Sequence, residues 1–290
     1  MAKRKIQSEE FDPNAKTVIE NPTVTNTPVP ADPVQAIVEK AAQKATSEVG
    51  FIEIEGLPTK GALYPEGTLI KGRSMNVKEV KALSNMNGNN ANNIINEILK
   101  STTRGIDVSD IYTVDKLYIV FWLRANTYPD SGFEVGFECG ECNKDSTYQF
   151  ELSNLKVQDF EEERHEKYLK GLTTPSGDKI NFKLLQVSDE EENDKFVKTH
   201  ETATNDFDEE TVSLARMITH INGEKKGTIA KYTYLTEEIS PADYIHIQSF
   251  TENHGMGVQP SINVTCKKCG GDTDTVLPFR PDFFLPKVTA

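Results

Sequence analysis

Two pairs of cysteines constrain the fold of this chain more than any other feature of its sequence. The pairs are Cys139-Gly-Glu-Cys142 and Cys266-Lys-Lys-Cys269, and they contain all four cysteines of the chain. A CxxC turn, or knuckle, places two thiolates on one side of a tight bend, so two knuckles can supply a complete tetrahedral zinc shell. The sequence therefore predicts one structural Zn²⁺ per chain, held by Cys139, Cys142, Cys266 and Cys269.

Segments typical of β-strands flank both knuckles. Apolar and polar residues alternate in Phe133–Phe137 and Thr147–Phe150 around the first pair, and in Ser261–Thr265 and Thr273–Leu277 around the second. This is the layout of a zinc ribbon, in which two β-hairpins present their knuckles to one metal ion.

The two knuckles are similar to each other but far apart in sequence. Gly270 follows Cys269, and Asn143 takes the same place after Cys142. Glycine and asparagine are the residues that most readily adopt a positive φ, which lets the chain turn away from a metal. Between Cys142 and Cys266 lie 123 residues, whereas a compact ribbon has roughly 15 to 20. We therefore expect the metal to join two hairpins from distant parts of the chain.

Other readings of the cysteines remain open at this stage. The N-terminus lacks the apolar stretch of a signal peptide, and in a reducing cytoplasm a metal explains paired cysteines better than disulfides do. A disulfide and four unligated buried thiols are the remaining structural alternatives. A redox dithiol is a further alternative, but such motifs sit at a helix N-terminus, and both knuckles here lie between strands.

The remaining sequence offers no catalytic constellation, so we expect a protein that is not an enzyme. Motifs of zinc peptidases, nucleotide-binding loops and EF-hands are missing from the sequence, and four thiolates would leave a zinc ion no open position for water. The histidines lack a second ligand at metal or catalytic spacing, and we expect them to be structural: His165, His200, His220, His246 and His254.

Charge and hydropathy indicate which partners to expect. The 45 acidic and 32 basic residues give a formal charge of −13, which disfavours binding to a phosphate backbone. No stretch approaches the roughly 20 apolar residues of a membrane-spanning helix. We therefore expect protein partners, with no nucleic acid and no membrane span; the sequence leaves the oligomeric state open.

Composition divides the chain into three parts. Residues 1–50 are rich in Pro and Thr and are expected to form a flexible, disordered arm, although apolar spacing in Pro33–Glu48 would suit a short helix. Residues 51–160 and 161–290 are expected to form two α+β subdomains, each ending in a zinc knuckle. The predicted fold is thus α+β: a two-part globular body of short β-hairpins and packed helices, joined by a zinc-ribbon-like clasp of four cysteines.

Apolar spacing and capping signals predict the local elements. A β-hairpin is expected near the start of the globular part, in Phe51–Pro58 and Thr68–Lys71. Helices are expected around residues 77–83 and 94–99, over 114–125 with Thr113 as a cap, after a capping box at Ser188–Glu191, over 209–220, and from Ser240 to Gly255.

A series of short motifs, taken in order, resembles one known family. They are Leu57-Pro-Thr-Lys-Gly-Ala-Leu-Tyr64, Thr103-Arg-Gly-Ile-Asp-Val-Ser-Asp110, Asp115-Lys-Leu-Tyr-Ile-Val-Phe-Trp-Leu-Arg124, Phe137-Glu-Cys-Gly-Glu-Cys142, Phe150-Glu-Leu-Ser-Asn-Leu155, Thr173-Thr-Pro-Ser-Gly177, Cys266-Lys-Lys-Cys-Gly270 and Phe283-Phe-Leu-Pro286. Together they make residues 51 to 286 similar to the baseplate hub assembly proteins of T4-like contractile-tailed bacteriophages.

The resemblance implies a non-enzymatic role in building the central hub of the tail baseplate, with other baseplate and hub proteins as partners. It places the protein in the host cytoplasm during assembly and leaves open whether it stays in the virion. Two alternatives from other classes remain: a zinc-ribbon module that binds nucleic acid, and a thiol-disulfide oxidoreductase. The first would require basic and aromatic residues near the knuckles, where Glu138 and Glu141 instead oppose Lys267 and Lys268.

Overall fold

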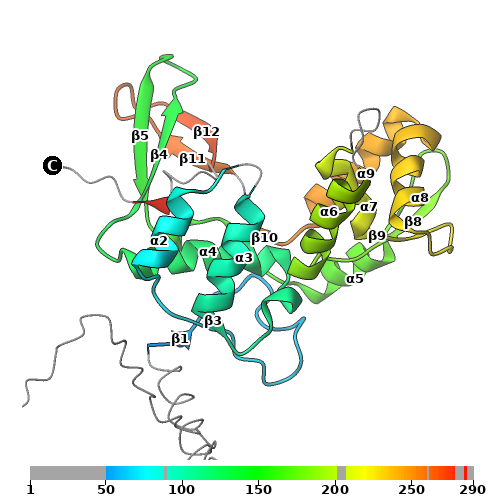
Figure 1. Ribbon diagram of the computed structural model, residues 1–290. Helices are drawn as coiled ribbons and strands as arrows, with labels where there is room; N and C mark the ends of the chain where they lie inside the picture. Colours follow the sequence, from blue (N-terminus) through cyan, green and yellow to red (C-terminus); the bar gives the residue numbers. More distant parts are fainter. Residues whose placement is uncertain (1–49, 88–89, 201–206, 260, 278–283, 286–290) are drawn as a thin grey trace, which may run out of the picture. The chain divides into compact units, whose positions relative to one another are not determined.

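The fold is α+β, as the sequence predicts, and is seen in a computed structural model (Figure 1). The structure describes residues 50–87, 90–200, 207–259, 261–277 and 284–285. The flexible arm predicted for residues 1–50, with its short helix in Pro33–Glu48, lies outside this range apart from Gly50. Within the described residues, no helix has the length and the apolar character needed to cross a membrane.

The globular part opens with the predicted antiparallel hairpin, although its strands are short. Strand β1 (Ile52–Glu53) pairs with β2 (Lys71–Gly72), and β2 pairs with β3 (Thr103–Arg104) to give a three-stranded antiparallel sheet. The Gly- and Pro-containing segment between β1 and β2 folds as turns.

Three α-helices follow the first hairpin. They are α2 (Val77–Ser84), α3 (Ala91–Thr102) and α4 (Thr113–Thr127), with the 3₁₀ turn η1 (Val108–Asp110) between α3 and α4. The three helices lie where the sequence predicts them, but Val77, an expected member of the apolar face of α2, is 70% exposed. Asn76 and Glu79 form a reciprocal capping box at the start of α2. The predicted Thr113 cap is wrong, because α4 already begins at Thr113 and its N-cap, Tyr112, makes no side-chain cap bond.

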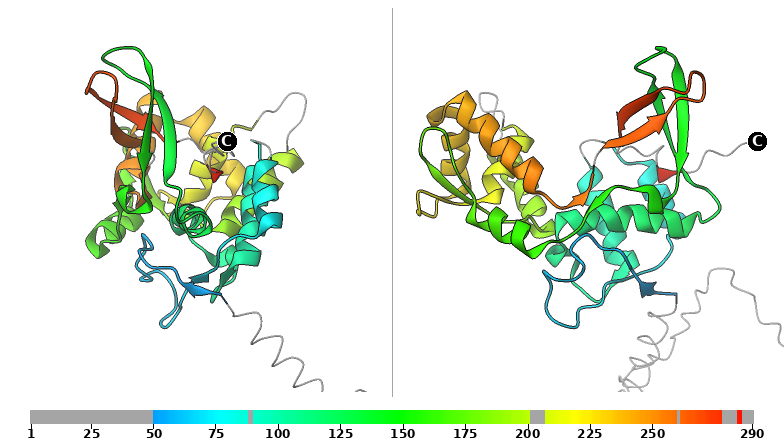
Figure 2. Two further views of the ribbon diagram at one scale, coloured as in Figure 1. Left: turned by 90° about the vertical axis from the view of Figure 1, so that its left-hand side faces the viewer. Right: turned by 180° about the vertical axis from the view of Figure 1, so that it is seen from behind.

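The two predicted zinc-ribbon hairpins are both present and lie side by side (Figures 1 and 2). Strand β4 (Phe133–Glu138) pairs with β5 (Asp145–Phe150), and β11 (Ser261–Thr265) pairs with β12 (Asp272–Val276). Burial alternates along β4 and β11 as the sequence pattern predicts. The turn η2 (Leu152–Asn154) and a short pair, β6 (Val157–Gln158) with β10 (Gly257–Val258), complete this region.

Helices and one antiparallel sheet make up the sequence between β6 and β10. The helical elements are α5 (Glu162–Lys170), α6 (Val187–His200), α7 (Glu209–Met217), α8 (Thr228–Thr233), the π-helical turn η3 (Tyr234–Glu238) and α9 (Pro241–His254). The sheet has the order β7 (Leu172–Thr173), β8 (Lys179–Phe182) and β9 (Ile218–Ile221). The predicted start of α9 is confirmed, because the Ser240 hydroxyl accepts a hydrogen bond from the Asp243 amide.

Two helix boundaries differ from their predictions. Helix α6 begins at Val187, one residue before the expected Ser188–Glu191 capping box, because the Asp189 carboxylate accepts a hydrogen bond from the Gln186 amide. Helix α7 ends at Met217 rather than near His220, because residues 218–221 join the sheet as β9. Pairing with β8 overrides the helical spacing there.

The buried apolar residues fall into two clusters. The first core cluster draws on residues from Ile54 to Val187 and again from Val258 to Phe284, and it contains the single tryptophan, Trp122. The second core cluster draws on residues from Tyr168 to Ile247. The subdomain boundaries 51–160 and 161–290 stay a prediction.

Candidate metal centre

Each hairpin carries one CxxC knuckle at its turn, between the end of one strand and the start of the next. Cys139 follows β4 directly, and Cys266 follows β11 directly. Stacking fixes the base of the first hairpin, where the rings of Phe133 and Phe150 lie 5.2 Å apart between centroids. Each knuckle therefore lies at the turn of its strand pair, and its first cysteine is buried in the first core cluster.

The two knuckles have the same hydrogen-bonding pattern. In the first, the Asn143 amide donates to the Cys139 carbonyl at 2.8 Å, and the Cys139 amide donates to the carbonyl of the next residue, Lys144. In the second, the Gly270 amide donates to the Cys266 carbonyl at 2.9 Å, and the Cys266 amide donates to the carbonyl of Gly271.

The predicted positive φ after each pair is confirmed. Asn143 has a φ of 52° and Gly270 has a φ of 79°. Asparagine tolerates this left-handed conformation better than most residues with a Cβ, and glycine adopts it freely. The internal similarity of the two knuckles therefore extends from the sequence to the backbone.

The four sulfurs converge. Their Sγ atoms all lie within 4.8 Å of one another. Cys139 and Cys269 are 3.6 Å apart, and Cys142 and Cys266 are 3.9 Å apart, between sulfurs. Four sulfurs at about 2.3 Å from a zinc ion would be separated by about 3.8 Å along each edge of the tetrahedron. The cluster therefore has the size of a zinc shell before any rearrangement.

Backbone amides around the sulfurs favour negatively charged thiolates. The amides of Cys142 and Glu141 donate to the Cys139 sulfur and lower the pKa of that thiol to about 6. The Lys268 amide donates to the Cys266 sulfur at 3.4 Å and lowers the pKa of that thiol as well. These bonds are typical of the shell around a metal-binding thiolate.

The fourth thiol shows why the cluster needs a cation. The Gly271 amide, 3.4 Å from the Cys269 sulfur, lowers the pKa of Cys269, but the neighbouring Cys142 and Cys139 sulfurs outweigh it and raise that pKa to about 12. Sulfurs this close cannot all be thiolates without a positive charge among them. The donor set therefore fits a divalent metal that prefers sulfur ligands.

Direct contacts also join the two hairpins. The Gly140 amide donates to the Thr273 hydroxyl at 3.1 Å, and that hydroxyl donates to the Cys139 sulfur at 3.8 Å. Thr273 thus links β12 to the first knuckle. The sequence predicts that Thr273 lies in a strand but gives no sign of its contact with the other hairpin. Cys139 and Cys266 are buried, Cys142 is partly buried and Cys269 is exposed.

A buried arginine supports the hairpin β4–β5 at its base. Arg124 is 2% exposed and donates to the carbonyl oxygens of Ser131 and Gly132, at 2.7 and 3.0 Å, just before β4 begins. Its guanidinium also lies over the Phe133 ring, 4.9 Å from the centroid. This arrangement ties the last turn of α4 to the start of the metal-binding hairpin.

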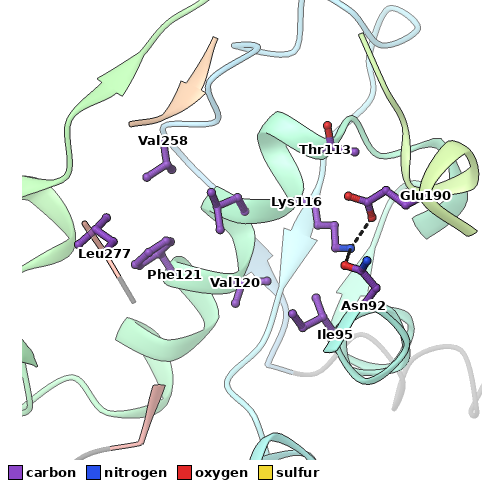
Figure 3. Close-up of a pocket in the computed structure, with 10 residues that line it drawn as sticks. Asn92, Ile95, Thr113, Lys116, Val120, Phe121, Glu190, Val258 and Leu277 are labelled. Atoms are coloured by element: carbon purple, nitrogen blue, oxygen red, sulfur yellow. Dashed lines mark hydrogen bonds and ion pairs between the residues drawn. The ribbon is translucent and has the colours of Figure 1, made fainter. Parts of the chain in front are cut away.

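A separate hollow lies against α4, outside the cysteine cluster (Figure 3). It has a volume of about 370 Å³, and its walls are mostly apolar, with Ile95 from α3 and Val120 from α4 among them. At its polar end, the Lys116 Nζ donates to Glu190 of α6 at 2.5 Å and to Asn92 of α3 at 3.4 Å. The ion pair joins two residues that are 74 positions apart in the sequence.

The cysteines are the single grouping of three or more His, Cys, Asp or Glu side chains close enough to bind a metal among the described residues. Two of the histidines that the sequence predicts to be structural pack against aromatic rings: His165 against Phe160, and His200 against Phe196. The cysteine cluster therefore offers four sulfur atoms as possible metal ligands.

Comparison with known proteins identifies the family. No match to the chain was found among the curated proteins or among the solved structures. The family model described as "T4 bacteriophage base plate protein" matches residues 53–285, which include both core clusters and all four cysteines. The chain therefore belongs to the T4 bacteriophage base plate protein family.

Proposed function

We propose that this base plate protein is a non-enzymatic part of the baseplate hub, and that one Zn²⁺ bound by Cys139, Cys142, Cys266 and Cys269 holds its two hairpins together. The observation that carries the proposal is the convergence of four sulfurs within 4.8 Å from hairpins that are distant in sequence. Family membership supports a structural baseplate component. The hub is the finer part of the proposal, and it rests on the ordered motifs of the sequence.

The chemistry of the site favours a structural role. A zinc ion with four thiolate ligands has no open position for water or substrate, so it cross-links without catalysing. Cys139 and Cys266, the first cysteine of each knuckle, are buried. The zinc would replace the missing covalent link between β4–β5 and β11–β12 and keep the surface above them in one shape.

Association with other baseplate proteins follows from the family. The partners would be built into the baseplate with this chain, in the host cytoplasm during assembly, and the chain would then remain in the tail. The formal charge of −13 supports docking to proteins rather than to the phage genome.

Metal content tests the zinc proposal. Elemental analysis of the purified chain should give one zinc per chain. Cys266→Ser should lose the metal and lower the midpoint of thermal unfolding by about 10 °C or more, because a structural zinc contributes directly to folding.

Cys269→His is the matched variant for this test. A histidine nitrogen can replace a thiolate in a tetrahedral zinc shell, and Cys269 is exposed enough to accept the larger ring. This variant should keep zinc and most of the thermal stability. A metal-free wild-type chain with the same unfolding midpoint as Cys266→Ser would sink the zinc proposal.

Co-purification tests the baseplate role. The chain, tagged at its N-terminus and isolated from infected cells, should bring down other tail baseplate proteins identified by mass spectrometry. The same analysis of purified virions should contain peptides of the chain, since a structural component stays in the particle. Recovery of host proteins alone, with no chain in virions, would contradict the proposal.

A further inference from the structure

A strongly basic cavity lies beside the second core cluster, away from the cysteines. Its volume is about 500 Å³, and it is formed by the end of β8, the end of α7, strand β9, the following turn and α8. Six basic side chains line it, and no acidic residue is among its lining residues within the described part of the chain: Lys183, Arg216, His220, Lys225, Lys226 and Lys231. On a chain with a formal charge of −13, such a concentration of positive charge needs an explanation.

Lys231 is the most informative of these residues. It is 8% exposed, and its Nζ donates to the Ile218 carbonyl at 2.7 Å. That carbonyl is its one protein partner among the described residues, which leaves two N–H groups of the ammonium for whatever fills the cavity. Burial, together with the positive charges of Arg216 and Lys183, lowers the pKa of Lys231 to about 8.

Two of the other cations already have carboxylate partners at the edge of the cavity. Lys183 pairs with Asp189 at 2.6 Å, and Arg216 pairs with Glu192. Among the described residues, Lys225, Lys226 and Lys231 form no ion pair with a carboxylate. The carboxylate of Asp189 raises the pKa of Lys231 through its charge but is already paired with Lys183. A ligand that supplies further negative charge would therefore lower the cost of burying the Lys231 ammonium.

We propose that this cavity binds a phosphoryl group, either as free phosphate or as the phosphate of a nucleotide, with Lys231 at its base and Lys225 and Lys226 at its mouth. The cations come from several elements and converge on one hollow, which suits a tetrahedral dianion with oxygens in several directions. A single carboxylate presents two oxygens in one plane. The hydroxyls of Thr219 and Thr228 also line the cavity as neutral donors.

The structure favours a compact anion over a nucleic acid. Phosphate backbones are bound by extended basic surfaces, whereas the basic groups here are confined to one cavity. The carboxylates of Asp189 and Glu192, which pair with Lys183 and Arg216, would repel the neighbouring phosphates of a longer chain. This site is independent of the zinc centre and of the baseplate role.

Isothermal titration calorimetry on the full chain tests the proposal, with inorganic phosphate, pyrophosphate and ATP as separate probes at an ionic strength matched with sodium chloride. At least one of these three probes should bind to the chain saturably. Lys231→Met, which keeps most of the length of the side chain and removes its charge, should weaken that binding about tenfold or more. Tighter binding of ATP than of phosphate and pyrophosphate would assign a nucleotide as the ligand. Binding of phosphate or pyrophosphate at least as tight as that of ATP would assign the free inorganic anion.

Two further variants separate a loss of binding from a loss of folding. Lys225→Met with Lys226→Met changes residues at the mouth of the cavity and should also weaken binding, with an unchanged circular dichroism spectrum. Lys198→Met removes a charge from an exposed position on α6, outside the cavity, and should bind like the wild type. Absence of saturable binding, wild-type affinity in the Lys231 and Lys225/Lys226 variants, or tighter binding of citrate than of phosphate would overturn the proposal.

Discussion

Asp115 is the clearest case in which a single residue organises its surroundings. It is fully buried at the start of α4 and accepts hydrogen bonds from the Thr59 amide at 3.0 Å, the Thr59 hydroxyl at 2.6 Å and the Tyr64 hydroxyl at 2.7 Å. The Tyr64 oxygen in turn accepts from the Tyr112 amide. One carboxylate thus fixes the turn segment after β1 against α4.

Asp115→Ala should lower the free energy of unfolding by about 3 kcal/mol, because it leaves three buried donors without their acceptor. Urea unfolding at neutral pH measures this loss. Asp110→Asn is the control, since Asp110 is exposed and lies five residues away along the chain. A loss in Asp115→Ala no larger than in the control would show that the turn segment is held by other contacts.

The same carboxyl group should make stability depend on pH. Burial raises the pKa of Asp115 above its usual range, and the hydrogen bonds from Thr59 and Tyr64 offset this only in part. The folded state therefore binds the proton more tightly than the unfolded state, in which the pKa is about 3.9. The part of the stability that comes from protonation of Asp115 is complete below about pH 4 and is lost as the pH rises through the folded-state pKa, whereas the hydrogen bonds accepted by the carboxylate persist. Unfolding curves from pH 4 to pH 8 should show this decline in the wild type relative to Asp115→Asn.

The sequence predicts the residues of the metal centre better than those of the buried polar contacts. Cysteine pairs are readable because CxxC spacing, strand flanks and the following Gly270 or Asn143 are local signals. The bond between Thr59 and Asp115 spans 56 residues, and the bond from Lys231 to Ile218 depends on where α8 packs. No local period marks such partners, so they become visible in the folded chain alone.

At the scale of elements, one glycine of the hairpins lies in a knuckle at positive φ and another lies inside a strand. Gly270, with a φ of 79°, has no atom within 4 Å of the position where a Cβ would lie. A substitution there meets strain from the backbone conformation alone. Gly136, in the middle of β4, also has open space at the Cβ position, but its φ is not positive.

This difference makes a matched pair of variants. Gly270→Ala should lower the free energy of unfolding by about 1 kcal/mol, because alanine disfavours the left-handed region. Gly136→Ala should raise it by up to about 0.5 kcal/mol, because glycine weakens a strand interior. Chemical denaturation of both zinc-loaded variants gives the comparison. Equal effects of the two substitutions would mean that the second knuckle does not hold its residue at positive φ.

Element boundaries were harder to predict than element types. The predicted helices α2, α3, α4 and α9 are confirmed because each has clear apolar spacing or a strong cap. The run Ile218-Thr-His-Ile221 continues the helical spacing of α7 but contains β-branched residues, and pairing with β8 decides its conformation. The charged run at Glu161–Arg164 gave no clear period, and it nevertheless opens α5.

At the scale of the whole molecule, three of the four predicted zinc ligands are associated with one of the two core clusters, and the fourth, Cys269, is exposed. Cys139 and Cys266 are members of the first core cluster, and Cys142 packs against it, whereas the second core cluster contains no cysteine among its described members. The single tryptophan, Trp122, is 6% exposed and also belongs to the first cluster. Its fluorescence therefore reports on the cluster that the metal would stabilise.

Removal of the metal should accordingly destabilise the first core cluster selectively. After treatment with a chelator, the transition followed by Trp122 fluorescence should move to lower denaturant concentration, because the link between β4–β5 and β11–β12 is lost. Hydrogen exchange measured by mass spectrometry should quicken in those hairpins, while amides of α7 and β9 in the second cluster keep their protection. Added zinc should restore both signals, and magnesium, which prefers oxygen ligands, should not. Equal loss of protection in both clusters would instead mean that they unfold as one unit and that the zinc stabilises the whole described body.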